Sequence, residues 1–383
     1  MLQLLRRASA SEFMRNVKRL VVGNVLSQII TLLSMLIVAR LFDPGEFGIA
    51  ALFLSITMIF STIGSLRYDQ AIVLPESDYI AIRLLELSIL VAIASSVVLL
   101  IMMIILAWIA PEFVWLNQLG VWFYAIPLGA LLMAMFYAFS AWRMRQKHFS
   151  RLAVAPVVLS TVTAGGRIGF GCWWGSSVAG LILGALMGVF AQLYVVSAGA
   201  SAILRGDKEV GSQSRSGFQK LLREYREFPL YAAPATLVKQ LGENMPVLLL
   251  SLMFAPAVVG FYAVANRLVR LPVGMVSESM RKVYLQRAAQ RMNSGIALRS
   301  DLFKVTIMML TIGAIPTAFL VIAGPWLFTV FLGEQWGVAG EFTVILAPWL
   351  LAIFAAAPAS TIYIVLRRQS LWLRMQASRT TIM

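Results

Sequence analysis

Long apolar segments recur along the whole chain and restrict what it can fold into. A bilayer core about 30 Å thick is crossed by about 20 mostly apolar residues in a helix. The weakest such segment is 152–172, because Gly165, Gly166 and Arg167 interrupt it. Counting all the segments of this kind predicts ten membrane spans, at residues 20–39, 46–64, 87–110, 119–142, 152–172, 178–204, 228–254, 256–280, 303–323 and 342–366.

The composition supports a membrane protein. Of the 383 residues, 60% are hydrophobic and 13% are charged, against about 45–50% and about 25% in soluble domains. We therefore expect an all-α membrane protein. With one cysteine, Cys172, and one histidine, His148, the chain cannot form an internal disulfide framework, and a metal site built on Cys or His is disfavoured. We expect neither a metal nor a cofactor.

Lysine and arginine collect between the predicted spans. With the N-terminus inside, the cytoplasmic segments hold 27 of the 32 basic residues. Because positive loops stay on the cytoplasmic side, this distribution predicts a multi-pass protein with a cytoplasmic N-terminus. It also explains the net charge of +15 without nucleic acid as a partner. The remaining five basic residues are Arg40, Arg167, Lys239, Arg267 and Arg270.

The loops between the spans are short and carry no catalytic pattern. The sequence has no P-loop, no paired-carboxylate motif and no Ser/His/Asp set. A single histidine also leaves little capacity for acid–base chemistry. We therefore expect a protein that acts within or across the bilayer and is not an enzyme.

A weak internal repeat divides the chain. Residues 41–56 align with residues 253–268 at an offset of 212, with Phe, Pro, Gly and Ala matched. Parallel repeats are a known transporter architecture, although chance similarity between Pro- and Gly-marked helices stays open. The repeat predicts two pseudo-symmetric bundles, residues 1–227 with six spans and residues 228–383 with four.

Three segments of the chain are distinctive. They are ARLFDPGEFGIAALFLSITMIFSTIGSLRYDQAIVLP (39–75), VGFYAVANRLVRLP (259–272) and LGEQWGVAGEFTVILAPWLLAIFAAAP (332–358). These segments resemble the polysaccharide-biosynthesis membrane proteins, which flip O-antigen units and other lipid-linked oligosaccharides. The resemblance extends from about residue 13 to about residue 369, and the Leu66–Asp69 and Gly333–Trp336 patches are its more specific parts. The same superfamily holds multidrug exporters and lipid II flippases.

The resemblance implies two six-helix bundles around a central cavity that opens alternately to each side of the bacterial inner membrane. It implies a short glycan on undecaprenyl pyrophosphate as substrate, and transport driven by a gradient of H⁺ or Na⁺. Membrane lipids, and polysaccharide polymerase or assembly proteins, are the implied partners. Because the second half supplies four spans of the six, we expect a C-terminally truncated member.

Charges inside the spans are the candidate substrate-binding groups. A charge at a helix centre costs about 2.5–3.5 kcal/mol even on the lenient insertion scale. Lys239 and Arg267 lie about 16 Å into their spans at 1.5 Å per residue, and Arg270 follows one turn later. They fit a pyrophosphate clamp, or Lys239 is simply neutralised by Glu243 at i+4. Glu243 is alternatively a carboxylate that binds the coupling ion.

Polar residues elsewhere supply further candidates. Asn24 and Gln28 share one face of the first span and suit either sugar hydroxyls or hydrogen bonds between helices. Arg67 and Asp69 follow the second span, where they form an inner gate or only stabilise the loop. Arg40, at the outer end of the first span, is a gate candidate or reaches to the interface.

Tryptophans mark the presumed outer ends of the spans. Tryptophan favours the membrane–water interface, where its ring is half in the apolar region. We therefore expect interfacial anchoring rather than ligand stacking for Trp108, Trp115, Trp122, Trp326, Trp336 and Trp349.

Three other functions stay open beside the flippase. A small-molecule exporter of the same superfamily would favour acidic residues in its cavity, whereas the intramembrane charges here are mostly basic. A membrane-embedded glycan polymerase or transferase would carry a sizeable polar loop, which the predicted topology lacks. An inactive fragment is the third, because the second half of the chain is short.

Overall fold

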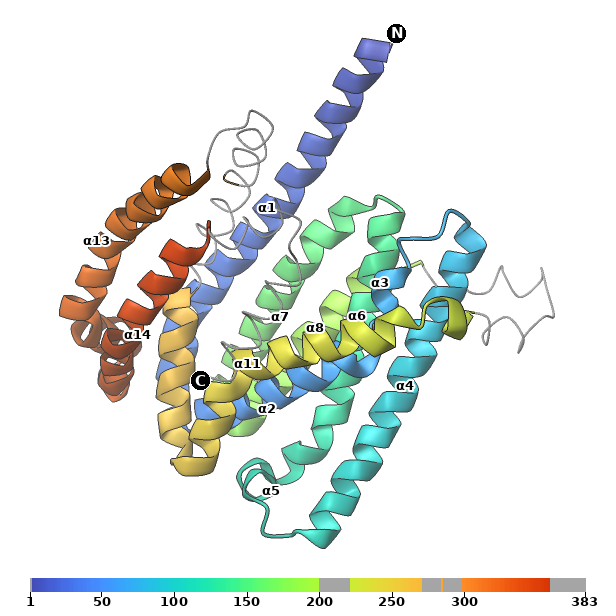
Figure 1. Ribbon diagram of the computed structural model, residues 1–383. Coiled ribbons are helices and arrows are strands. Elements are labelled where there is room, and N and C mark those ends of the chain that lie inside the picture. The colour runs from blue at the N-terminus through green and yellow to red at the C-terminus, as the bar shows by residue number, and fades with distance from the viewer. Residues whose placement is uncertain (1, 200–220, 271–283, 285–297, 359–383) are drawn as a thin grey trace. The chain divides into compact units, whose positions relative to one another are not determined.

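The computed structural model describes every residue except 1, 200–220, 271–283, 285–297 and 359–383 (Figure 1). Among the described residues there are helices and turns but no strand. Eight of the described helices are long and apolar enough to cross a membrane. The predicted all-α membrane class is confirmed. The chain divides into two compact units, Met1–Val259 and Gly260–Met383.

The first unit is a helical bundle. Helix α7 packs against α1 and α8, while α6 packs against α2, α4 and α8, and α11 packs against α2. Its helices are α1 (Leu2–Leu41), α2 (Pro44–Gly64), α3 (Tyr68–Ala71), α4 (Asp78–Ile109), α5 (Val114–Leu119), η1 (Gly120–Ala125), α6 (Ile126–Arg145), α7 (Phe149–Trp174), α8 (Val178–Ser197), η3 (Phe228–Ala232) and α11 (Ala233–Met253). We call the end where α2, α6 and α8 finish the basal end, and the opposite end the distal end.

The second unit contains a long helical hairpin. Its helices are α13 (Leu298–Leu332), η4 (Glu334–Trp336) and α14 (Gly337–Ala356), and α13 packs along α14. Residues 256–270 form a further helix that begins in the first unit and enters the second. Trp336 is fully buried, with its ring edge-on to Phe261 at 6.0 Å between centroids. This contact joins the helix at 256–270 to the start of α14.

The turn between α1 and α2 is built by a capping box. Asp43 and Glu46 bond reciprocally to each other's backbone at the start of α2, and Pro44 occupies its first turn, where a missing N–H costs nothing. The Ser176 hydroxyl donates to the Glu46 carboxylate and accepts from the Asp43 backbone N–H at 3.1 Å. Phe42 is 1% exposed and lies against Gly171 and Gly180. The α1–α2 turn is therefore fixed to α7, α8 and their connection at the distal end.

Glycines let α7 approach its neighbours closely. A Cβ at Gly23 of α1 would overlap the carbonyl oxygen of Ala153 on α7. A Cβ at Gly184 of α8 would lie 2.8 Å from the backbone nitrogen of Arg167. Small residues at such contacts allow the close packing that holds helices together in lipid. The glycines beside Arg167 do not break the helix, because α7 runs unbroken from Phe149 to Trp174.

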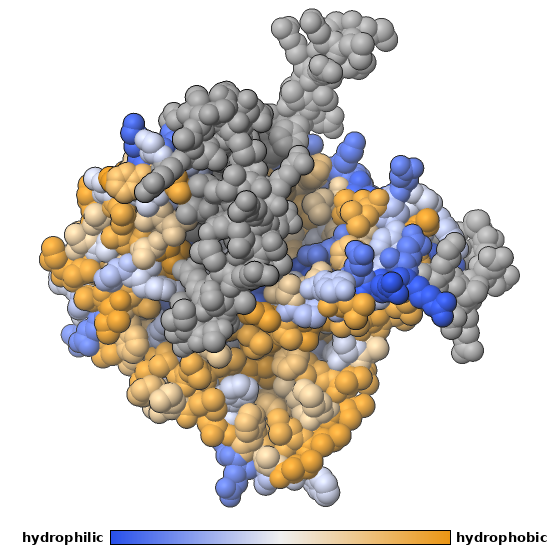
Figure 2. Space-filling model, viewed as in Figure 1, coloured by the Kyte–Doolittle hydropathy of each residue, from blue (hydrophilic) through white to orange (hydrophobic). Residues whose placement is uncertain are grey.

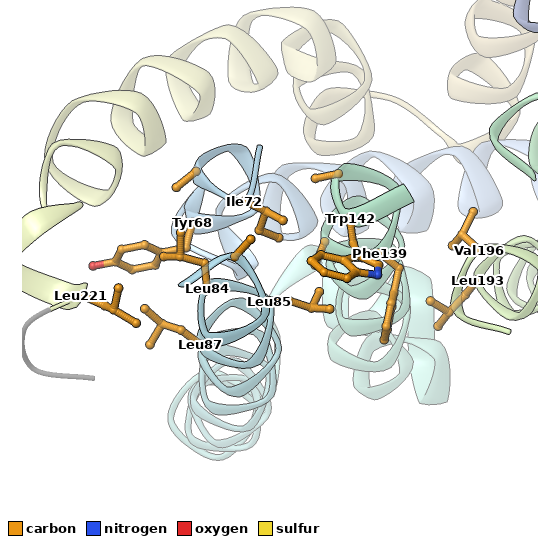
Figure 3. Close-up of a cluster of buried hydrophobic side chains, with 14 of the residues drawn as sticks. Tyr68, Ile72, Leu84, Leu85, Leu87, Phe139, Trp142, Leu193, Val196 and Leu221 are labelled. Atoms are coloured by element: carbon orange, nitrogen blue, oxygen red, sulfur yellow. The ribbon is translucent and has the colours of Figure 1, made fainter. Parts of the chain in front are cut away.

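A hydrophobic cluster fills the basal end of the first unit (Figure 3). It fixes the start of α4 against the end of α6, beside the turn that carries Arg67 and Asp69. Removing this much apolar surface from water or polar headgroups is favourable at about 25 cal/mol per Å². Its labelled members are Tyr68, Ile72, Leu84, Leu85, Leu87, Phe139, Trp142, Leu193, Val196 and Leu221.

Large apolar side chains face outward on the helices. Hydrophobic residues cover much of the surface seen in Figure 2, while hydrophilic residues gather in patches. Leu33 on α1 and Val98 on α4 are 60% and 63% exposed. Contiguous exposed apolar surface of this extent is not tolerated by a monomer in water, whereas a bilayer accommodates it.

Eight of the ten predicted spans correspond to the eight apolar helices. The seventh is helical as α11, but Lys239, Gln240, Glu243 and Asn244 make it more polar than the others. The eighth is helical over 256–270, and its predicted remainder lies outside the described residues. The predicted boundary between the two repeats, at residue 227, stays a prediction. Helix α11 follows that boundary in sequence but belongs to the first compact unit.

We expect Gly23→Ala to destabilise the protein. The new methyl group has no room against the backbone of α7, and overpacking of this kind costs about 1–3 kcal/mol. Gly169→Ala is the matched control, because no atom lies within 4 Å of its Cβ position and alanine is the better helix former. Thermal unfolding of the purified protein in detergent measures both, and equal melting temperatures would contradict the close α1–α7 contact.

Candidate functional site

Two arginines lie one helical turn apart on the helix formed by residues 256–270. Arg267 is exposed and Arg270 is half-buried. The guanidinium carbon of Arg270 lies 5.3 Å from the ring centroid of Trp349 on α14, within cation–π distance. Among the described residues, neither guanidinium has a hydrogen-bond acceptor or a carboxylate partner. Both side chains therefore keep their N–H donors available for an anion.

Two tryptophans at or in α14 bear on the prediction of interfacial anchoring, which is wrong for Trp336 and stays a prediction for Trp349. Trp336 is 0% exposed and packs inside the second unit. Trp349 lies 12 residues after the start of α14, about 18 Å along the helix, under Arg270. Exposed tryptophans at helix ends, such as Trp108 and Trp326, fit the interfacial expectation.

Lys239 and Glu243 form an ion pair on α11. Their charged atoms are 3.9 Å apart, and the side chains are 60% and 46% exposed. This is the within-helix pair that the i, i+4 spacing predicts as one alternative, and an exposed pair is worth about 0–1 kcal/mol. Lys239 belongs to the first unit and Arg267 to the second, so the predicted meeting of these two cations stays a prediction.

Asn24 and Gln28 lie beside the contact between α1 and α7. Ser27, next to Gln28, donates to the backbone carbonyl of Pro156 at 2.8 Å. Asn24 is exposed, whereas the side-chain oxygen of Gln28 is buried and has no hydrogen-bond partner among the described residues. A buried acceptor without a donor is costly. Gln28 is therefore the better placed of the two to bind a hydroxyl group.

The Arg67–Asp69 turn closes the basal end of α2. Arg67 adopts a left-handed backbone with φ of 64°, which places its guanidinium 4.0 Å from the Asp69 carboxylate. Asp69 is 5% exposed and accepts from the Ser65 hydroxyl at 2.5 Å. Tyr137 of α6 lies within electrostatic range of both charges. The predicted pair is present and is largely buried, so it organises this turn.

Arg40 occupies the last turn of α1 and is exposed. A cation at this position is favourable, because the helix dipole places partial negative charge on the final carbonyls. From this position the Arg40 side chain can extend to the membrane surface or can act in a gate, so both interpretations stay open.

The sequence does not single out Arg143, which is 3% exposed at the end of α6. Its guanidinium donates to the carbonyls of Val196 at 2.7 Å and Ala198 at 2.6 Å, and Arg151 also donates to Ala198. These contacts satisfy carbonyls that the end of α8 leaves without helical partners. A count of loop charges cannot find this role, because the acceptors lie about 50 residues away in sequence.

Arg145 ties the basal ends of α4 and α6 together. It donates to the Asp78 carboxylate at 2.8 Å and to the carbonyls of Pro75 and Glu76. Arginine suits this task because its planar fork offers five donors. The connection before α4 therefore moves with the end of α6.

The charges of the candidate site favour an anionic ligand. No three His, Cys, Asp or Glu side chains converge among the described residues. Glu243 is paired with Lys239, and Asp69 is paired with Arg67. The cations of residues 256–270 have no such counter-ion in the described part of the chain. Two arginines one helical turn apart are suited to bind an anion such as phosphate.

Comparison with known proteins decides the family. Residues 37–341 match the family described as polysaccharide biosynthesis protein. The chain belongs to this family. No curated protein matches the sequence. The fold is similar to an inward-facing multidrug resistance MATE family transporter of the MOP superfamily, with TM-score 0.64 and 16% identity over 93% of this chain and 85% of the other.

A MATE transporter, ClbM in complex with Rb⁺, has TM-score 0.47 and 13% identity over 96% of this chain and 84% of the other, which is too distant for a structural argument. The first likeness, at 16% identity, establishes the fold alone. Membership of the polysaccharide biosynthesis family and the eight apolar helices together support a multi-pass membrane protein.

We expect Asp69→Asn to destabilise the protein by about 1–3 kcal/mol. It removes the buried counter-charge of Arg67, and a buried charge left without its partner is costly. Asp78→Asn is the matched control, since its carboxylate is 82% exposed and an exposed pair contributes about 0–1 kcal/mol. Melting temperatures in detergent compare the two. A larger effect of Asp78→Asn would contradict the assignment of the buried pair.

Proposed function

We propose that this protein translocates an oligosaccharide linked to undecaprenyl pyrophosphate across the bacterial inner membrane by alternating access. The observation that carries the proposal is the pair Arg267 and Arg270, whose guanidinium groups have no acceptor among the described residues. Family membership supports a saccharide as cargo, and the fold supports transport. The basic segments support an N-terminus in the cytoplasm.

The arginine pair answers the main energetic difficulty of such a substrate. A charge at the bilayer centre costs about 2.5–3.5 kcal/mol on insertion scales, and pyrophosphate brings more than one. Arginine binds phosphate oxygens through paired N–H donors and stays charged at every physiological pH. We assign Arg267 and Arg270 to the phosphates, with Lys239 as a further cation.

We assign the binding of the sugar and of the coupling ion to other polar groups. Asn24 and the buried oxygen of Gln28 suit sugar hydroxyls, which donate as well as accept. Glu243 is the proposed carboxylate for H⁺ or Na⁺, with its ion pair to Lys239 competing for the same charge. Arg67, Asp69 and Arg40 are proposed to act at the two ends of the pathway. A polymerase or assembly protein would take up the translocated glycan.

We expect the double variant Arg267→Gln/Arg270→Gln to lose at least about tenfold in transport, since each charge-assisted hydrogen bond contributes about 1.5–3 kcal/mol. The assay uses proteoliposomes with the full chain and an undecaprenyl-pyrophosphate disaccharide. A membrane-impermeant glycosidase measures how much lipid has crossed.

Lys304→Gln serves as the control, because Lys304 is an exposed cation of the second unit outside the proposed pathway. It should transport at the rate of the unchanged protein. Normal transport by the double arginine variant would contradict the proposed site. A protein that moves no lipid but exports a small organic cation would contradict the proposed substrate.

A further inference from the structure

Arg270 and Arg267 are held in different ways, although they are one turn apart. The guanidinium carbon of Arg270 lies over the Trp349 ring, 5.3 Å from its centroid, whereas Arg267 is exposed and has no ring contact among the described residues. Side chains at i and i+3 have Cβ atoms about 5–6 Å apart. The helix therefore presents one restrained guanidinium and one free guanidinium side by side.

A cation–π contact restrains a guanidinium without supplying a hydrogen-bond acceptor. The cation is attracted to the π face of the ring, so the five N–H donors of the arginine keep their capacity for oxygen acceptors. Trp349 can therefore fix the orientation of Arg270 while leaving its donor edge open. In the described residues no acceptor occupies that edge.

The position of Trp349 is suited to this contact rather than to the membrane surface. Arg270 is 14 residues after the start of its helix and Trp349 is 12 residues after the start of α14. At 1.5 Å per residue these are about 21 Å and about 18 Å along their helices. Tryptophan anchors at the membrane–water interface, and Trp349 is poorly placed for this role so far from the start of α14.

We infer that Trp349 is a positioning residue that holds Arg270 as a preformed anion-binding fork, so that Arg270 and Arg267 together recognise two linked phosphates. The inference rests on the proposed function and adds a specificity. A pyrophosphate engages both arginines, whereas a monophosphate engages either one, so that Arg267 can still bind it when Arg270 is replaced. The site therefore selects polyprenyl pyrophosphate over polyprenyl monophosphate, and Trp349 is needed for that selection.

Preorganisation is the physical basis of the selection. A free arginine loses rotamer freedom when it binds, and this loss reduces affinity. Trp349 removes that freedom in advance for Arg270. Replacing the ring by leucine keeps an apolar side chain in place but ends the cation–π contact. We expect it to cost about tenfold in affinity for the pyrophosphate, or about 1.4 kcal/mol.

The experiment measures the binding of two probes to the full chain in lipid nanodiscs. The probes are undecaprenyl pyrophosphate and undecaprenyl monophosphate. Trp349→Leu and Arg270→Gln should each weaken pyrophosphate binding about tenfold and change monophosphate binding less than about twofold. Trp349→Phe, which keeps a ring for the cation to contact, should retain most of the preference. Trp326→Leu, at a 63% exposed position, should change neither affinity.

A double-mutant cycle separates positioning from simple packing. If Trp349 acts through Arg270, the variant Trp349→Leu/Arg270→Gln binds pyrophosphate no more weakly than Arg270→Gln. Additive losses would overturn the inference, as would equal losses for both lipids in Trp349→Leu. An unchanged preference in that variant would also overturn it, while leaving the proposed function in place. Binding of neither lipid by the unchanged protein would overturn the proposed function as well.

Discussion

Close approach between helix backbones is the contact on which the first unit depends. Lipid chains are as apolar as leucine, so burying apolar side chains between helices gains little, and dispersion contacts at small residues replace that drive. Gly23 brings α1 onto α7, and Gly184 brings α8 onto the other side of α7. The arrangement of the remaining helices follows, because α6 reaches α8 and carries α2 and α4.

Arginines in or at the ends of apolar helices need acceptors, and three of them have acceptors among the described residues. Arg143 binds the carbonyls that end α8, Arg145 binds the connection before α4, and Arg167 donates to the carbonyl of Leu181 at 3.2 Å. These cations stabilise structure. Arg267 differs from them, because it has no acceptor among the described residues. This contrast is the reason for assigning Arg267 to a ligand.

Hydropathy predicts the fold class and ten spans, eight of which are the apolar helices of the described residues, because bilayer thickness sets the length of a span whatever its neighbours are. Hydropathy does not predict which helices contact one another. The sequence predicts the span at 152–172 but treats Gly165–Arg167 only as a weak point in it. In the structure these residues are a packing site, because their partner Gly184 is found only in three dimensions. The contact of Trp349 with Arg270 is likewise absent from the sequence prediction, because it joins two helices far apart in the chain. The paired residues Lys239 and Glu243 follow a local rule, and their contact is predicted correctly.

The clasp of Ser176 on Asp43 and Glu46 has a mechanical consequence. It joins two reversals of the chain at the distal end, while Arg143 and Arg145 join three helices at the basal end. Because hydrogen bonds connect the helices of the first unit at both ends, we do not expect these helices to separate one at a time. We therefore expect α1, α2, α7 and α8 to move as one body at the distal end of the first unit.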